Sequence, residues 1–320
     1  MARLVMSNTI VPKHTAAPAG DASTSPAAGP TGQKPRTRPA GRRVWIADGW
    51  GALTLPMAAY LLVVLILPLV IVLARSFTDP EVGLGNYRAM TESPVYLNVL
   101  VNTFVTAITV TAITLLIGFP YAYLMTLVPN FWRNVLLVVV LVPFWTSLLV
   151  RSFALVLLLR DTGVVNETLQ AVGLIDAPIP LVRNFSGVLI GMVQVLLPFM
   201  VLPLYATMRG IDRRLLAAAE GLGARPSFAF WRIFVPLSAP GVIAGALLVF
   251  IQSLGFYITP TLLGGPKNVM LGELIVQQVS SVLRWGFAAA LAVVLLVTTL
   301  VLLAIASRFI DLRRMFSKEP

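Results

Sequence analysis

The sequence predicts an all-α polytopic membrane protein with six transmembrane helices. Of its 320 residues, 58% are hydrophobic and only 12% are charged, and its mean hydropathy is +0.87. A soluble domain is usually about 45–50% apolar and about 25% charged, so this excess is too large for a water-soluble core. Long uncharged stretches alternate with short polar ones, and several reach the ~20 residues that a helix needs to cross a bilayer.

The residue counts exclude several kinds of chemistry. The chain has no cysteine, which excludes disulfides, thiolate metal sites and cysteine nucleophiles. The single histidine, His14, lies in a polar stretch, which excludes histidine metal sites and Ser/His/Asp triads inside the membrane. We therefore predict no metal site and no catalytic residue. The net charge of +11 is expected at the cytoplasmic membrane edge, beside membrane lipid and with no nucleic-acid partner.

Residues 1–43 differ in composition from the rest of the chain. They are rich in Ala, Pro, Gly, Ser and Thr, with basic residues and with prolines spread along their length. Such a segment cannot bury enough apolar surface to offset the entropy lost on ordering, and it lacks the apolar core of a signal peptide. We predict a disordered basic cytoplasmic tail, which serves as a solvated tether or, alternatively, as a docking or lipid-binding segment.

The remaining residues, 44–320, are predicted to form one transmembrane domain. Six apolar runs are expected to span the membrane, at about 52–74, 102–127, 134–158, 185–208, 237–258 and 286–307. The third run is the least regular, because Arg151 interrupts it. Either the arginine side chain extends to the interface, or the segment after it turns along the membrane surface. Lone prolines inside several runs are tolerated in transmembrane helices, with kinks.

The distribution of basic residues predicts the orientation. With an even number of spans both termini lie on one side, which then carries 17 of the 24 Lys and Arg residues. Seven of the 17 belong to the tail and five to the loop between the fourth and fifth spans. Cytoplasmic loops carry an excess of Lys and Arg. Both termini are therefore expected in the cytoplasm.

The spans lack the groups that carriers and enzymes use. As drawn, they contain no Asp, Glu, Lys or His, whereas proton- and ion-coupled transporters usually place ionisable groups at membrane depth. The chain also lacks a phosphate-binding G-x-x-x-x-G-K-[ST] loop, which indicates that it does not hydrolyse nucleotides. A channel, a secondary carrier and a membrane scaffold or enzyme remain as alternatives, but no feature of the chain favours them.

The most informative segment is the basic loop 209–236. Asp212 is a good helix cap, and residues 213–222 are strong helix formers. Gly223 stands where a helix C′ position favours a left-handed residue. We therefore predict a first helix over 213–222 and a second, capped by Ser227, over 228–234. The second helix is expected to end at Pro236, where the fifth span begins.

This loop resembles the EAA loop of ABC importer permeases. The family pattern is E-A-A, a glycine four residues after the second alanine, and then I-x-L-P. Ala218, Ala219, Gly223, Ile233 and Pro236 match it at the same spacing. The sequence departs from the pattern in two places, with Ala217 where the family has Glu and Val235 where it has Leu.

In the family that Glu helps to hold the loop in a cleft of the ATPase. Glu220, three residues after Ala217, lies near the same helix face and is expected to substitute for it in part.

Flanking segments are similar to the spermidine/putrescine-type permeases. The similar stretches are Gly85–Tyr87, Asn102–Thr103, Pro143–Ser147, Gly163, Asn166, Leu197–Tyr205, Leu254–Pro260 and Leu263–Lys267. The resemblance covers roughly residues 50–310 and implies the transmembrane fold of a type I (MetI-like) importer in a bacterial inner membrane. It implies a permease role for this chain, beside a second homologous permease, an ABC ATPase dimer and a periplasmic solute-binding protein. The chain would hold no cofactor, and ATP and Mg²⁺ would bind the ATPase.

The resemblance also implies that loop 209–236 couples ATP hydrolysis to movement of the helices, and that solute passes between the two permeases. A polyamine cation would be guided by aromatic faces; the candidates are Phe144, Trp145, Phe256, Tyr257 and Trp285. These side chains could equally be interfacial or core aromatics. Four acids are expected on the outer side, and they either meet a cation or a docking protein or are solvated loop charges: Asp161, Glu167, Asp176 and Glu273. The alternative solutes are an opine, an amino-acid derivative or another small molecule.

Overall fold

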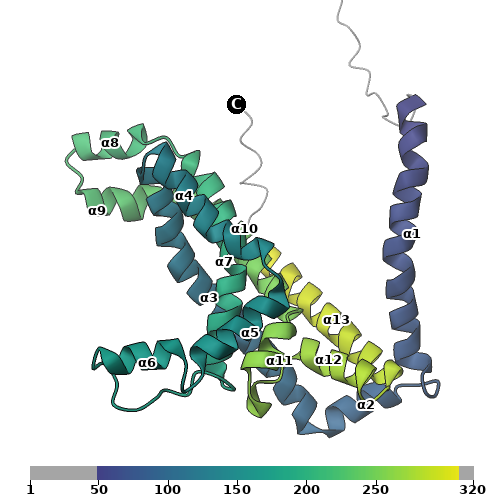
Figure 1. The fold of residues 1–320 in the computed structure, drawn as a ribbon. Helices are drawn as coiled ribbons and strands as arrows, with labels where there is room; N and C mark the ends of the chain where they lie inside the picture. Colours follow the sequence, from purple (N-terminus) through teal and green to yellow (C-terminus); the bar gives the residue numbers. More distant parts are fainter. Residues whose placement is uncertain (1–48, 310–320) are drawn as a thin grey trace, which may run out of the picture. The chain divides into compact units, whose positions relative to one another are not determined.

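The computed structural model describes residues 49–309, so the predicted tail at 1–43 lies outside the described residues. The chain divides into two compact units, Met1–Met57 and Ala58–Pro320, and the contacts below all belong to the second. The described part is helical and contains no strand, as predicted (Figure 1). Its helices are α1 (Gly49–Thr78), α2 (Gly85–Glu92), α3 (Pro94–Leu127), α4 (Asn130–Leu141), α5 (Leu148–Leu159), α6 (Val164–Ala171), α7 (Phe185–Arg209), α8 (Arg214–Gly221), α9 (Pro226–Ala229), α10 (Val235–Leu254), α11 (Ile258–Leu263), α12 (Leu271–Ser280) and α13 (Trp285–Phe309).

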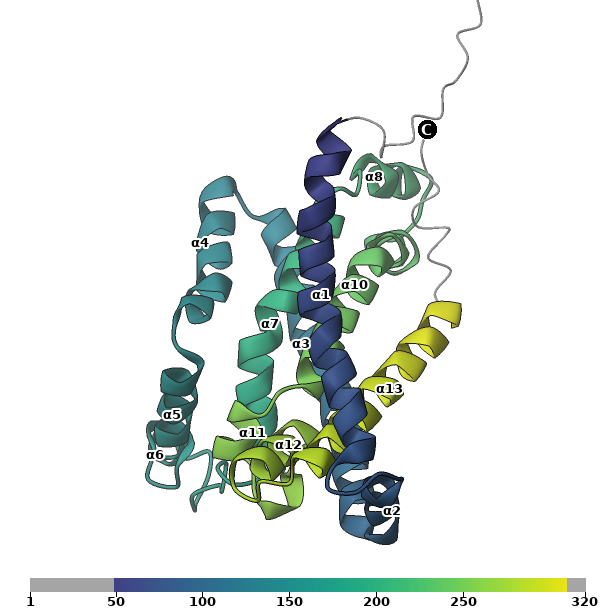
Figure 2. The same cartoon turned by 90° about the vertical axis from the view of Figure 1, so that its right-hand side faces the viewer.

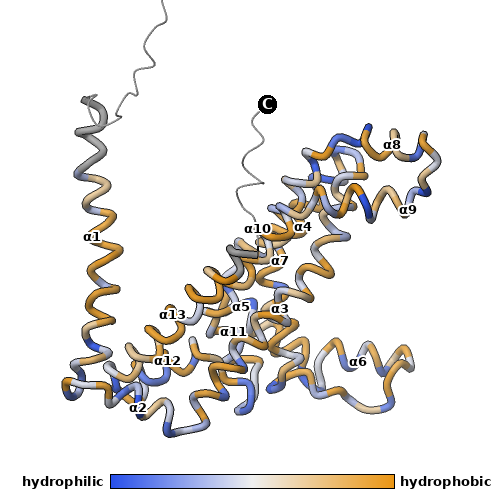
Figure 3. Tube along the Cα trace, turned by 180° about the vertical axis from the view of Figure 1, so that it is seen from behind, coloured by the Kyte–Doolittle hydropathy of each residue, from blue (hydrophilic) through white to orange (hydrophobic). Residues whose placement is uncertain are grey.

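Five of the described helical runs are long and apolar enough to cross a membrane. They are Pro56–Thr78, Pro94–Leu127, Phe185–Arg209, Pro226–Leu254 and Trp285–Ile305. A sixth span is reached only if the broken pair Asn130–Trp145 and Leu148–Ala171 counts as one. Figure 3 shows the apolar character along α1, α7, α10 and α13 and the polar stretches near α2 and the α8–α9 turn.

Helices α3, α7 and α10 pack together and form the core of the fold (Figure 2). Met192, Met200, Leu204 and Met208 are buried on α7. Their spacing of four and eight residues places them on one face of the helix, and a bundle forms because that face meets α3 and α10. Gly241 and Gly245 of α10 lie against α7, so the two backbones approach closely.

The third predicted span is not one continuous helix, and the bend lies just before Arg151 rather than after it. The chain bends by 102° between Asn130–Trp145 and Leu148–Ala171, because Thr146 is extended and Ser147, with a ψ of 133°, is not helical either. Arg151 stabilises the break: its guanidinium donates to the Thr146 carbonyl at 3.0 Å and to the Thr146 hydroxyl at 3.0–3.1 Å. The arginine thus binds the backbone oxygen that the end of the helix leaves free.

The start of the fifth span also differs from the prediction. The second short helix does not end at Pro236, because Pro226–Leu254 is one continuous helical run. It begins at Pro226 rather than after a Ser227 cap. Residues Phe230–Phe234 form a π-helical turn, in which the Val235 N–H bonds to the Phe230 carbonyl. A proline lacks an N–H and crowds the carbonyl four residues before it; the wider turn accommodates Pro236 without a break.

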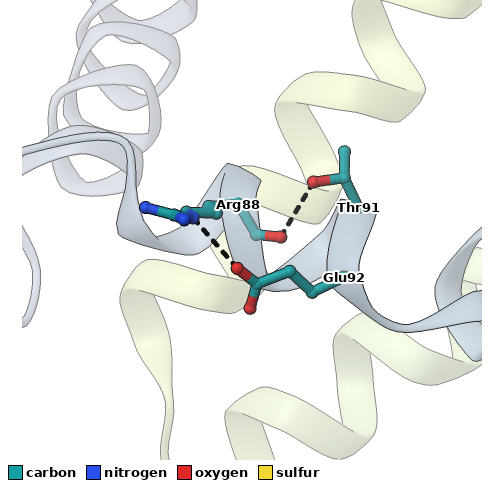
Figure 4. Close-up of polar contacts among 3 residues, drawn as sticks. All are labelled: Arg88, Thr91 and Glu92. Atoms are coloured by element: carbon teal, nitrogen blue, oxygen red, sulfur yellow. Dashed lines mark hydrogen bonds and ion pairs between the residues drawn. The ribbon is translucent and has the colours of Figure 1, made fainter.

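Short polar contacts shape the connection between α1 and α2. The Asn86 side chain donates to the carbonyls of Ser76 and Asp79, at 3.1 and 2.8 Å. On α2, Arg88 Nε lies 2.9 Å from Glu92 Oε1, and the Thr91 hydroxyl donates to the Arg88 carbonyl (Figure 4). This is the one ion pair within residues 49–309, and both of its side chains are exposed, so it contributes about 0–1 kcal/mol.

The segment around α6 is closed by a buried asparagine. Asn166 has no exposed surface. Its side chain donates to the carbonyls of Arg160 and Ile179, at 3.1 and 3.0 Å, and accepts from the Ile179 N–H at 2.9 Å. One side chain therefore fixes both ends of the segment 160–179.

We expect Asn166→Ala to open this segment while the bundle stays folded. The change removes both hydrogen bonds that the Asn166 side chain makes to the Ile179 backbone, worth together about 1–3 kcal/mol, whereas the Arg160 carbonyl keeps the Gly163 N–H as a donor. Hydrogen exchange of residues 160–179 in detergent should speed up markedly, with slow exchange retained in α7. The control is Glu167→Ala, which removes an exposed neighbour; equal protection in the two variants would contradict the role given to Asn166.

Candidate functional site

The α8–α9 segment, residues 212–231, lies at one end of the α3–α7–α10 bundle, opposite the end that carries α11 and α12 (Figures 1 and 2). Helix α8 begins one residue later than predicted, at Arg214. The Asp212 carboxylate accepts the Arg214 N–H at 2.9 Å, and its carbonyl accepts the Leu215 N–H at 3.2 Å. Asp212 therefore caps this helix end, as its position in the sequence predicts.

The turn after α8 has the hydrogen bonds of a Schellman motif. The Gly223 N–H bonds to the Glu220 carbonyl at 2.9 Å, and the Ala224 N–H bonds to the Ala219 carbonyl at 3.0 Å. Gly223 has a φ of +90°, a region that side chains other than glycine rarely adopt. The predicted left-handed glycine is confirmed, and its conformation turns the chain back towards α9.

Two groups of contacts attach this segment to α3. Arg213 donates a hydrogen bond to the Thr126 carbonyl near the end of α3. The Phe230 ring meets Tyr123 edge-on at 5.1 Å and stacks on Phe234 at 5.6 Å. Sequence reasoning missed both groups. The spacing of Phe230 and Phe234 predicts one helix face, but only the fold brings Tyr123 to it.

Ala217 and Glu220 line the same pocket, which has a volume of about 210 Å³. Arg213, Tyr123 and Phe234 also line it, so the pocket lies between α8 and the bundle. The structure thus places Glu220 on the helix face of Ala217, as expected. The remaining residues of the motif do not line this pocket: Ala218 and Gly223 are exposed, Ala219 is half-buried, and Ile233 and Pro236 belong to the helical run Pro226–Leu254.

The structure does not gather the five aromatic candidates into one site. Phe144 and Trp145 precede the break in the third span; Phe144 contacts Phe199 at 5.6 Å, and Trp145 is 78% exposed. Phe256 and Tyr257 lie in the turn between α10 and α11. No ring contact within residues 49–309 joins two of the five candidates.

Trp285 begins α13 and lies beneath the Arg75 guanidinium, 5.9 Å from the ring centre. This arrangement suits an aromatic residue at a membrane interface.

Comparison with known proteins gives a consistent result. Residues 115–315 match the family described as the binding-protein-dependent transport system inner membrane component. The chain is 38% identical to the spermidine/putrescine transport system permease protein PotB of Escherichia coli, over 74% of this chain and 86% of that protein. It is 34% identical to the PotB of Haemophilus influenzae, over 78% of this chain and 90% of that protein.

The fold resembles that of a solved bacterial ABC transporter for the acidic polysaccharide alginate. That crystal structure aligns with a TM-score of 0.65 and 22% identity, over 86% of this chain and all of the matched chain. At this identity the match supports the fold. The match to the family covers most of the transmembrane domain, including the α8–α9 segment. The chain therefore belongs to the family of binding-protein-dependent transport system inner membrane components, and is a multi-pass permease of the inner membrane.

Proposed function

We propose that this chain is a pathway-forming subunit of an ATP-driven polyamine importer, and that its α8–α9 segment docks on the ATPase. The observation that carries the proposal is the form of this segment. It is a short helix and a tight turn that expose large apolar side chains at one end of the bundle: Leu215, Leu222, Phe228 and Trp231. Leu222 is 91% exposed, and exposed apolar patches of this kind mark protein interfaces.

The attachment of the segment suggests how it would transmit force. Arg213 and Phe230 tie it to α3, and the helical run from Pro226 continues as α10. A push on α8 would therefore move α3, α7 and α10 together. ATP and Mg²⁺ would bind the ATPase dimer. Closure of the dimer would switch the pathway from inward-facing to outward-facing, because the dimer contacts the permease differently in these two states.

A second permease is the natural partner of α1. None of the residues in the most apolar part of this span is buried. An apolar crevice of about 480 Å³ opens between α1 and α13, lined by residues that include Leu69, Leu73, Val293 and Val297. Packing of a second chain here would cover side chains that otherwise face lipid. We place the α8–α9 end and both termini in the cytoplasm, as the basic residues indicate.

The polyamine assignment rests on the permeases named for spermidine and putrescine. A solute-binding protein is expected to deliver the solute; one structural neighbour was solved with a periplasmic protein. Another small solute is the alternative, because a relative at 27% identity from Haloferax volcanii is named as a probable molybdenum permease.

The test is reconstitution of this chain with its ATPase, second permease and binding protein in proteoliposomes. We expect uptake of labelled spermidine or putrescine that requires ATP, and ATP hydrolysis that loaded binding protein stimulates. Vesicles that lack the ATPase are the control. A thermal-shift screen of the binding protein covers other solutes. Uptake without ATP would contradict the proposal of an ATP-driven importer. Stabilisation of the binding protein only by a non-polyamine solute would contradict the assignment of a polyamine as the substrate.

A further inference from the structure

Glu273 occupies a fixed position at the start of α12. It is the third residue of this helix, and a backbone hydrogen bond from Met270 reaches its carboxylate. The residues before it are held firmly: the Leu271 N–H donates to the Thr103 hydroxyl at 2.8 Å, and Met270 and Leu271 have no exposed surface. The carboxylate is therefore presented by a rigid element rather than by a loose loop.

Helix α12 lies directly against the turn that carries two of the aromatic candidates. A Cβ built on Gly272 would lie 3.2 Å from the Phe256 carbonyl oxygen and 3.4 Å from Tyr257 Cβ. Because consecutive Cα atoms are about 3.8 Å apart, the Cα of Glu273 lies within about 9 Å of Tyr257 Cβ. Tyr257 is 41% exposed. The backbone of an acid and that of an exposed aromatic residue thus lie near each other at the end of the bundle opposite α8, within reach of a flexible glutamate side chain.

This acid lacks a cation partner among the residues that the structure describes. Within residues 49–309 the ion pair of Figure 4 is the only one, so no Lys or Arg nitrogen lies within 4.0 Å of Glu273. Burial raises the pKa of the Glu273 carboxyl, and the Met270 hydrogen bond opposes that rise. A partly buried carboxylate without a cation is costly, and a bound ammonium group would relieve that cost.

The other acids expected on the outer side differ from Glu273. Asp161, Glu167 and Asp176 belong to the segment around α6, and all three are exposed. Water already solvates such charges, so they gain little from a cation. Glu273 combines partial burial, a fixed backbone and an aromatic neighbour. Carboxylates and aromatic faces both attract ammonium groups.

We infer that Glu273, with Phe256 and Tyr257, forms a recognition site for an ammonium group of the transported cation. The inference rests on the proposed polyamine importer and assigns the anionic group that the spans themselves lack. A polyamine carries several ammonium groups on a flexible chain. One of them would pair with the carboxylate while the methylene chain or a second ammonium group lies on the aromatic rings.

The test uses Glu273→Gln in the complete reconstituted transporter. Glutamine keeps the volume and the acceptor oxygen that caps α12 and removes the charge. We expect kcat/KM for spermidine uptake to fall about tenfold, as for a lost hydrogen bond to a charged group. Glu273→Asp should recover part of the loss, and Glu167→Gln should match the wild type. The melting temperature of the complex should stay unchanged.

The controls separate the ways in which the test can fail. No polyamine uptake by the wild type would overturn the proposed function. Polyamine uptake by the wild type and equally by Glu273→Gln would overturn this inference alone. A third outcome is that Glu273→Gln weakens binding of the solute-free binding protein to the transporter, while the KM for spermidine stays unchanged at saturating binding protein. The carboxylate then pairs with the binding protein, and the inference fails.

Discussion

Gly241→Val is expected to destabilise the bundle by forcing α7 and α10 apart. A Cβ at this position would lie 2.8 Å from both Cβ and Oγ1 of Thr207 and 2.9 Å from the Pro203 carbonyl oxygen. These neighbours belong to the backbone or to a stiff β-branched side chain, so the two helices must separate. Overpacking of this kind costs about 1–3 kcal/mol. We expect a melting temperature in detergent lowered by several degrees and a reduced yield of monodisperse protein.

The matched control is Gly221→Val at the end of α8. No atom lies within 4 Å of a Cβ built there, and the residue is exposed. This variant should melt like the wild type, and Gly241→Ala should fall between the two. An equal melting temperature for Gly221→Val and Gly241→Val would show that close approach of α7 and α10 does not limit stability.

Gly223→Val is expected to uncouple transport without unfolding the chain. The φ of +90° at Gly223 is strained for a β-branched residue, at about 1–3 kcal/mol, yet no atom lies within 4 Å of an added Cβ. The ratio of intact to altered turn should fall about 5- to 150-fold. In proteoliposomes, ATP-driven uptake and the stimulation of ATP hydrolysis by loaded binding protein should fall with it.

Gly173→Val is a control with the same backbone strain at the other end of the molecule. Gly173 also has positive φ, at +73°, and open space around it. Its variant should keep ATPase coupling. Gly223→Asn should keep much of it, because asparagine tolerates the left-handed region. Normal coupling in Gly223→Val would remove the α8–α9 segment as the site of ATPase contact.

Local features of the structure follow from the sequence because their causes are local. The Asp212 cap and the left-handed Gly223 depend on residues within one or two turns of chain, so residue type and spacing predict them. The helices form where apolar runs are long. The boundaries are less predictable: α3 begins at Pro94, eight residues before the expected start of that span. Contacts with the rest of the fold extend the amphipathic end of a helix beyond its apolar run. The length of the apolar run does not predict these contacts.

The prolines show why the position of the break in the third span was not predicted. Pro120 and Pro198 sit inside continuous helices, whereas Pro143 precedes a 102° bend. In the sequence all three look alike. The difference is that Arg151 binds the Thr146 carbonyl that the break leaves free. At Pro236 the sequence predicts a helix end, but the helix continues, because a π-helical turn accommodates the proline.

The sequence by itself determined the class of the protein, the approximate spans and the α8–α9 turn. Each of these depends on composition or on short spacing along the chain. Only the tertiary structure decided which aromatic residues stand near an acid, because Tyr257 and Glu273 lie on different elements. It also separated Glu273 from the exposed acids and placed Trp285 beneath Arg75. Burial and proximity arise when helices that are distant in the sequence pack together. The spacing of residues along the chain does not show which of these helices will be in contact.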